Sequence, residues 1–201
     1  MIDCLCMSAL PDFATHFAAM ERLVEAQPEE TRAEIARGVF AMTPRPRGRH
    51  GVVQGELFSA LRRHTGLLSS GESPDWLFAV EPEIRSAVTF SRLVPDVAGW
   101  RRSTTGWPGL DETPIELAPD WVGEILSPGT EAFDRGPKKD AYGLMGVGWL
   151  WLVDPARRVV EAFANVRGRM VEGPVFEEGL AIGAAPFEGL SISPAHLFPP
   201  A

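Results

Sequence analysis

The chain has 201 residues, 45% of them hydrophobic and 23% charged, which suits one globular domain with a single core and excludes a disordered chain. Acidic residues outnumber basic ones by 27 to 19, so the formal net charge is -8. This balance argues against a protein that binds nucleic acid mainly by neutralising phosphates. It argues less strongly against a metal-dependent nuclease, whose site is itself acidic.

The first part of the chain predicts two helices separated by a short strand. Residues 12–26 carry apolar side chains at helical spacing, and the helix should end before Pro28. A short apolar strand is expected at 39–42, followed by a proline- and arginine-rich turn at 43–48. The clearest amphipathic helix is 50–64, where apolar residues recur every four positions.

The rest of the chain is rich in strands. Strands are expected at 76–80, 94–100, 121–126 and 149–153, and a hairpin of edge strands at 159–164 and 169–171. Residues 103–119 predict a loop or hairpin, and 186–198 a closing apolar segment.

One crossover helix is expected between the third and fourth of these strands, at 137–145. It should start at about Gly136, because proline is tolerated only in the first turn of a helix; Lys138 would then lie in that turn. Helices followed by strands with one crossover helix indicate a mixed α/β fold. We expect an N-terminal helical appendage at 1–30 and one α/β domain at 31–201.

The sequence also bears on cellular location. No apolar run is long enough to cross a membrane, and the apolar start of the chain lacks the basic flank of a signal peptide. Cys4 and Cys6 stand too close together for an unstrained disulfide, and no zinc pattern completes them. We therefore expect reduced cysteines and a cytoplasmic protein.

Two carboxylates fall within apolar strands. Asp96 follows Pro95 at the start of one strand, and Glu124 lies inside WVGEIL. A buried carboxylate is costly unless it is paired, hydrogen-bonded or bound to metal, and a divalent cation would relieve the repulsion between two of them. Oxygen ligands suit Mg²⁺ or Mn²⁺, and a lysine nearby can stabilise charge or orient water. The alternative is that each is a solvated residue at a strand end.

Several neighbours of these acids have two interpretations. Asp134, Lys138 and Tyr142 are spaced four apart, which puts them on one helical face if the turn is already helical at Asp134. Asp134 either pairs with Lys138 or caps the helix, and Tyr142 either lines the site or packs on the sheet. Trp149 and Trp151 either pack in the core or form the contact of a homodimer.

A small basic patch precedes the second helix. Arg45, Arg47 and Arg49 stand just before His50 and either contact a phosphate backbone or form a solvated turn. Ser127 lacks the Gly-x-Ser-x-Gly surroundings of a nucleophile, which argues against a serine hydrolase.

Residues 95–155 resemble the Uma-two family of restriction-endonuclease-like proteins. The segments that carry the resemblance are PDVAGW, WVGEILSPGT and DRGPKKDAYGLMGVGWLWLVDP. Weaker agreement in AEIARGVFAM, PRPRGRHGVVQGEL and FEGLSISPAHLF extends it to residues 31–198.

The resemblance implies a PD-(D/E)XK nuclease core, in which helices flank a central mixed sheet. Asp96 and Glu124 match the acids of the family and would bind Mg²⁺ or Mn²⁺. The lysine of the plain motif would fall at Leu126, but Lys138 on the following helix matches it, and Glu34 matches an N-terminal glutamate. The implied activity is hydrolysis of DNA by metal-activated water.

Two departures from the family pattern keep other functions open. The chain has Gly148 and Leu150 around Trp149, where the family usually has Pro-Glu-Tyr, and Ala33 stands where an aromatic residue is common. One alternative is a catalytically inactive nuclease-fold module for interaction or assembly, which the acidic net charge favours. Another is a metal-dependent hydrolase of a small phosphorylated substrate, which would have a closed pocket.

Overall fold

The computed structural model describes residues 12–28, 31–44, 48–65, 75–109, 111, 113–177 and 179–200. Its helical segments are α1 (Phe13–Glu25), α2 (Arg49–His64), α3 (Glu131–Phe133), the π-helical turn η1 (Asp134–Lys138), α4 (Lys139–Met145) and α5 (Pro194–Leu197). Its strands are β1 (Thr31–Ala36), β2 (Val39–Pro44), β3 (Trp76–Val80), β4 (Ile84–Ser86), β5 (Ser91–Leu93), β6 (Val97–Arg101), β7 (Trp121–Ile125), β8 (Trp149–Asp154), β9 (Val159–Val166) and β10 (Arg169–Phe176). None of the described helices is both long and apolar enough to span a membrane.

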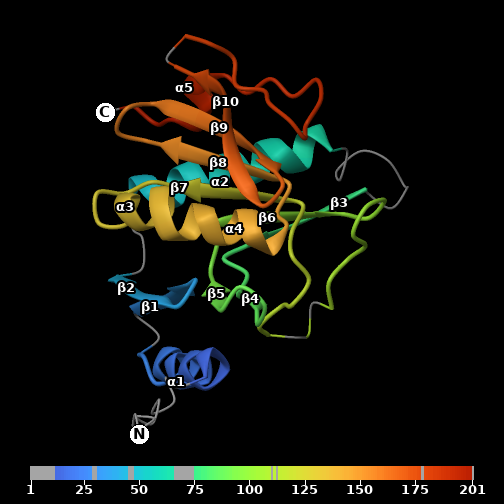
Figure 1. Cartoon of the computed structure of the whole chain (residues 1–201). Coiled ribbons are helices and arrows are strands. Elements are labelled where there is room, and N and C mark those ends of the chain that lie inside the picture. The colour runs from blue at the N-terminus through green and yellow to red at the C-terminus, as the bar shows by residue number, and fades with distance from the viewer. Residues whose placement is uncertain are drawn as a thin grey trace, which may run out of the picture.

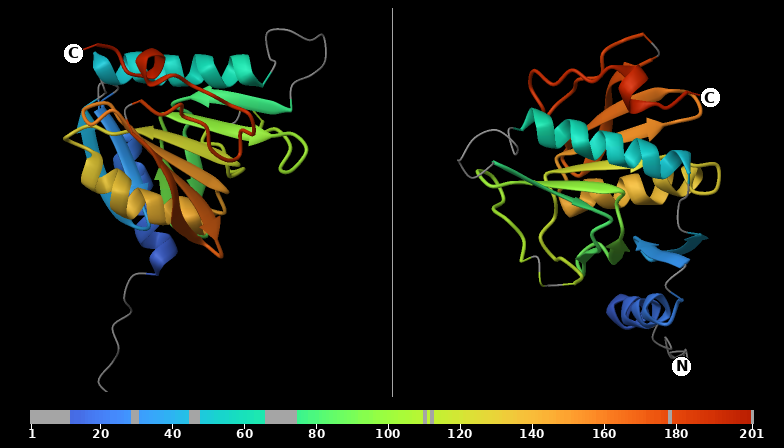
Figure 2. Two further views of the ribbon diagram at one scale, coloured as in Figure 1. Left: turned by 90° about the horizontal axis from the view of Figure 1, so that it is seen from above. Right: turned by 180° about the vertical axis from the view of Figure 1, so that it is seen from behind.

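A six-stranded sheet forms the centre, in the order β10-β9-β8-β7-β6-β3 (Figure 1). The β7–β8 pair is parallel and the other pairs of this sheet are antiparallel, so the sheet is mixed, as predicted. Helix α2 covers one face and the α3–η1–α4 segment covers the other (Figure 2). Two parallel neighbours need a crossover connection, and the α3–η1–α4 segment is that connection.

Side chains of β7 alternate between the two faces of the sheet. Trp121 and Ile125 pack in the core beneath α2, together with Leu57 of that helix. Val122 faces the other way and packs in the core beneath α4. Because the side-chain period of a strand is two, Glu124 shares the face of Val122 and points toward the crossover segment.

A second sheet of four strands, in the order β2-β1-β5-β4, lies beside the first (Figure 1). Helix α1 packs on it through Phe17 and Met20, which meet Ile35 of β1. Arg85 adds an ion pair to Glu21 of α1, with Nε 2.6 Å from Oε1. The proposed boundary at residue 30 remains a prediction. Cys4 and Cys6 lie outside the described residues.

The crossover helix begins earlier than predicted. The expected start at Gly136 is wrong: the helical segment starts at Glu131, and Lys138 ends the π turn instead of lying in a first turn. The backbone N–H of Lys139 donates to the carbonyl of Asp134, five residues back. A π turn of this kind accommodates Pro137, which has no N–H to donate. The strand at 31–36 was also not predicted.

The end of α4 fits closely against the β9–β10 hairpin. Asn165 Nδ2 donates to the carbonyls of Gly143 and Val147, each at 2.8 Å, and Asn165 Oδ1 accepts from Gly168 N at 2.8 Å. A Cβ on Gly143 would lie 2.7 Å from the carbonyl oxygen of Gly168. The atom that the added methyl group would meet belongs to the backbone of Gly168. No flexible side chain could therefore move aside to make room for it.

We therefore expect Gly143→Ala to lower the free energy of unfolding by about 1–3 kcal/mol. Gly136→Ala is the matched control, since a Cβ there meets nothing within 4 Å and alanine favours a helix. The midpoints of urea unfolding of both variants measure the difference. Equal midpoints would contradict the close fit of α4 and the hairpin.

Candidate active site

The four residues singled out in the sequence come together at one place between the two sheets. Asp96 immediately precedes β6, Glu124 lies in β7, Lys138 ends η1, and Glu34 lies in β1. Their exposed fractions are 4% for Glu34, 2% for Asp96, and 1% each for Glu124 and Lys138. Four ionisable side chains buried in one cluster must satisfy one another or take up a ligand.

Lys138 lies at the centre of the cluster. Its Nζ is 2.9 Å from Glu124 Oε1, 3.0 Å from Glu34 Oε1 and 3.6 Å from Asp134 Oδ1. It also donates to the carbonyl of Val94 at 3.3 Å. Burial acts to lower the pKa of Lys138, but the charges of Glu124, Glu34 and Asp134 outweigh it and raise the pKa. The lysine is therefore a permanent cation and not a base.

Asp96 is held by the side chains of Arg32 and His50 on one oxygen and by the backbone on the other. Its Oδ1 lies 2.9 Å from Arg32 Nη1 and 3.1 Å from His50 Nε2, and its Oδ2 accepts from Ile125 N at 2.7 Å. Burial acts to raise the pKa of Asp96, but the contact with His50 and the charge of Arg32 lower it to about 2. Asp96 is thus ionised at neutral pH.

Glu124 is the most strained carboxylate of the cluster in electrostatic terms. Tyr142 donates its hydroxyl to Glu124 Oε1, and Glu124 Oε2 lies 3.4 Å from Asp96 N. Burial, together with repulsion from Asp96 and Asp134, raises the pKa of Glu124 well above its ordinary value despite the charge of Lys138. Burial likewise raises the pKa of Tyr142, which stays a neutral donor. An additional cation would relieve this repulsion.

The cluster contains oxygen donors of the kind that hard divalent cations prefer. The buried charges gathered here are the carboxylates of Glu34, Asp96, Glu124 and Asp134 and the cations Arg32 and Lys138. The carboxylates exceed these cations by two, and carboxylate oxygens are the ligands that Mg²⁺ and Mn²⁺ prefer. The cluster lines a cavity of about 30 Å³. In the described part of the chain, however, no three acidic, histidine or cysteine side chains form a ready set of metal ligands.

The structure shows the contacts of Asp134, Tyr142 and the two tryptophans, for which the sequence left two interpretations each. Asp134 lies inside the helical run and pairs with Lys138, so the capping interpretation is wrong. Tyr142 both packs beneath the sheet and contacts Glu124. Trp151 is buried in the core, and Trp149 packs against it.

The sequence did not predict that Arg32 contacts the site or that His50 is buried. Arg32 and Glu34 are two residues apart on β1, and this spacing places both on one face of a strand. Predicting a strand at 31–36 would have brought Arg32 to the site. His50 is 9% exposed and turned toward Asp96, so it is not part of a solvated turn. Arg49 is exposed at the start of α2.

Two further sequence interpretations concern Ser127 and the basic patch before the second helix. Ser127 Oγ lies 3.0 Å from Thr130 Oγ1, in the turn that leads into α3, which fits a structural role. Arg45 and Arg47 lie outside the described residues, so the basic patch that they form with Arg49 stays a prediction.

Comparisons with known proteins show the family and the fold of the chain. The model of the Uma2 family, described as "Putative restriction endonuclease", matches residues 15–195. The crystal structure of "a putative nuclease belonging to DUF820" from Anabaena variabilis has a TM-score of 0.67 to this chain, with 21% sequence identity over 89% of this chain and 96% of that one. This likeness shows the fold and confirms the predicted nuclease-type α/β core. No curated protein matches the chain. Because the family model spans most of its length, the chain belongs to the Uma2 family.

Proposed function

We propose that the protein hydrolyses DNA phosphodiester bonds with Mg²⁺ or Mn²⁺ bound by Asp96 and Glu124. The observation that carries this proposal is the convergence of buried carboxylates on Lys138, at 2.9 Å from Glu124 and 3.0 Å from Glu34. A fold with no need for these charges would replace them with apolar residues at little cost in stability. Membership of the Uma2 family supports a nucleic acid as substrate.

The bound cation would activate water and stabilise the charge that develops on the phosphate. Asp96 suits a metal ligand because its low pKa keeps it ionised. Lys138 stays protonated, so it donates a hydrogen bond to an anionic oxygen or orients the attacking water. Glu34 assists by holding Lys138, and it is itself anchored by Val94 N at 2.7 Å.

The cavity is smaller than a preformed pocket for a small phosphorylated substrate would be. A volume of about 30 Å³ matches the share of one water in the liquid, whereas small-molecule sites usually exceed about 300 Å³. The exposed Arg49 directly precedes His50, which lines the cavity, and in this proposal it would contact a phosphate backbone.

The alternative of an inactive interaction module has a structural observation in its favour, besides the acidic net charge. Lys138 and Arg32 already lie against the carboxylates that would bind a metal, at 2.9 Å from Glu124 and from Asp96 respectively. Such a module would fold as described here and would cleave nothing.

Cleavage of plasmid and single-stranded DNA decides between the two functions. We expect wild-type protein to cleave with Mg²⁺ or Mn²⁺ and to stop in EDTA. Asp96→Asn should slow cleavage by about 10³-fold or more, and Lys138→Ala should slow it comparably. Equal cleavage by wild type and both variants would identify a contaminant. A folded wild type without cleavage of either DNA would support the interaction module.

A further inference from the structure

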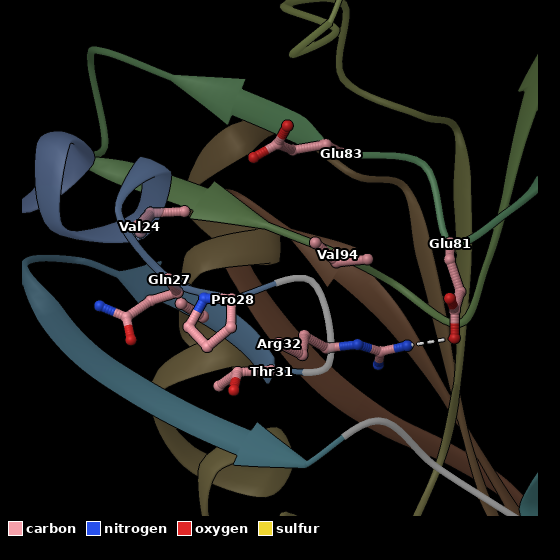
Figure 3. Close-up of a pocket in the computed structure, with 9 residues that line it drawn as sticks. Val24, Gln27, Pro28, Thr31, Arg32, Glu81, Glu83 and Val94 are labelled. Atoms are coloured by element: carbon pink, nitrogen blue, oxygen red, sulfur yellow. Dashed lines mark hydrogen bonds and ion pairs between the residues drawn. The ribbon is translucent and has the colours of Figure 1, made fainter.

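Arg32 joins two carboxylates from opposite sides. Its Nη1 donates to Asp96 Oδ1 at 2.9 Å, and its Nη2 donates to Glu81 (Figure 3). The side chain of Arg32 is 8% exposed, against 27% for Glu81. The guanidinium therefore links a buried site residue to a carboxylate nearer the surface.

Arg32 also stands between two cavities. It lines the small cavity above Asp96, and it lines a larger outer pocket of about 240 Å³. Glu81 and Glu83 line the outer pocket as well, and Figure 3 shows the Arg32 side chain extending toward Glu81. Arg32 thus has both open space and negative charge on the side away from Asp96.

The position of Glu81 is fixed relative to Asp96. Its φ is 49°, a left-handed conformation that is uncommon for glutamate, and its backbone N–H donates to the carbonyl of Asp96 at 3.1 Å. This bond keeps the backbone of Glu81 beside Asp96, and from there its carboxylate accepts from Arg32.

A divalent cation on Asp96 is incompatible with the present place of Arg32. The bond from Ile125 N to Asp96 Oδ2 comes from a neutral donor and can persist beside a metal. The guanidinium on Oδ1 carries a full charge, because an arginine side chain stays protonated in proteins. Two cations on one carboxylate repel each other strongly where little water screens them.

We propose that Arg32 is an internal counter-ion that competes with the divalent cation for Asp96 and withdraws toward Glu81 and the outer pocket when the cation binds. The inference rests on the metal site of the proposed function. It makes Arg32 a positioning residue: it holds Asp96 in the metal-free protein and sets the metal concentration at which the site loads.

Calorimetric titration of Mn²⁺ into the metal-free protein tests this role. We expect Arg32→Gln to bind Mn²⁺ about tenfold more tightly than wild type, because the competing charge is gone. Arg37→Gln is the matched control: Arg37 lies in the turn of the same β1–β2 hairpin, and its ion pair to Asp140, at 3.2 Å, is half-exposed. Arg37→Gln should bind Mn²⁺ as wild type does. Unchanged or weaker binding by Arg32→Gln overturns the proposal, since a purely structural arginine would give that result.

A crystal structure of wild type with Mn²⁺ gives an answer even if Arg32→Gln fails to fold. We expect Arg32 Nη1 to have left Asp96 Oδ1 while the guanidinium keeps its contact with Glu81. A metal on Asp96 with the 2.9 Å contact intact overturns the proposal.

The two proposals fail in different ways. Metal-dependent cleavage by wild type, combined with unchanged Mn²⁺ affinity in Arg32→Gln, overturns the role of Arg32 alone. Absence of Mn²⁺ binding to both wild type and Arg32→Gln overturns the metal site and this role with it.

Discussion

Replacing Lys138 by methionine is expected to lower the free energy of unfolding of the metal-free protein by about 3–5 kcal/mol at pH 7. Lys138 is 1% exposed and is the cation nearest to Glu124 and Glu34. Methionine fills much of the same space, so the loss would come from carboxylates left buried without their counter-charge. Added Mn²⁺ should restore part of the lost stability, because it supplies positive charge to the same group.

Lys139→Met is the control for this variant. Lys139 follows directly in the chain, but its Nζ lies over the ring of Phe163, at 5.2 Å from the centroid, instead of among the acids. We expect its replacement to change stability by less than about 1 kcal/mol. Guanidinium unfolding in EDTA measures both variants. Similar losses for the two would mean that Lys138 does not balance the buried carboxylates.

Glu124→Gln is expected to have opposite effects on activity and on stability. Cleavage should fall by about 10³-fold, because glutamine removes a charged metal ligand. The metal-free protein should become more stable by about 1 kcal/mol at pH 7, because the amide keeps the acceptor for Tyr142 and removes a carboxyl group whose ionisation is opposed by burial and by the neighbouring acids. Residues kept for function at the expense of stability show this combination.

The pH dependence of the stability gain gives the sharper test. Burial and the neighbouring acids raise the pKa of Glu124 in the folded state above its ordinary value of 4.5. The wild type therefore loses stability as pH rises through the folded pKa, because ionisation is easier in the unfolded chain. Glutamine does not titrate, so the advantage of Glu124→Gln should be largest at neutral pH and vanish below about pH 4.5.

Glu161→Gln serves as the comparison, because it should change the stability at neutral pH in the opposite direction to Glu124→Gln. Arg135 binds both oxygens of Glu161, at 2.6 and 2.8 Å, and this contact lowers the pKa of Glu161. Glu161→Gln should therefore cost about 1 kcal/mol at neutral pH, and this cost should disappear as pH falls through the folded pKa. If both glutamine variants lost stability at pH 7, Glu124 would not be under electrostatic strain.

Much of the fold could be predicted from periodicity. The 50–64 helix and the apolar strands of the central sheet were placed within a few residues, because burial on one or both faces leaves a regular pattern. The strand at 31–36 was missed because Arg32 and Glu34 interrupt its apolar pattern. Arg32 and Glu34 are polar because they face the charged cluster. The two polar residues that obscured the strand in the sequence are therefore also the ones that mark the site.

The prediction of the site was strongest where a charge lies inside an apolar strand. Asp96 and Glu124 stand out because buried carboxylates are costly, whereas Arg32 and His50 have neighbours that do not reveal their burial. Their contacts with Asp96 join residues 64 and 46 positions apart. Pairing at such separations depends on the sheet arrangement, which local sequence patterns do not specify.

The π turn at Asp134–Lys138 has a consequence for how this region tolerates changes in length. Gly136 and Pro137 resemble loop residues, and loops usually accept insertions and deletions. Here the two residues lie within a helix whose side chains at 134, 138 and 142 all reach the charged cluster. Losing one residue would turn everything after it by about 100° around the helix axis and carry Tyr142 away from Glu124. Relatives that keep the tyrosine should therefore keep the length of this stretch, even where its composition varies freely.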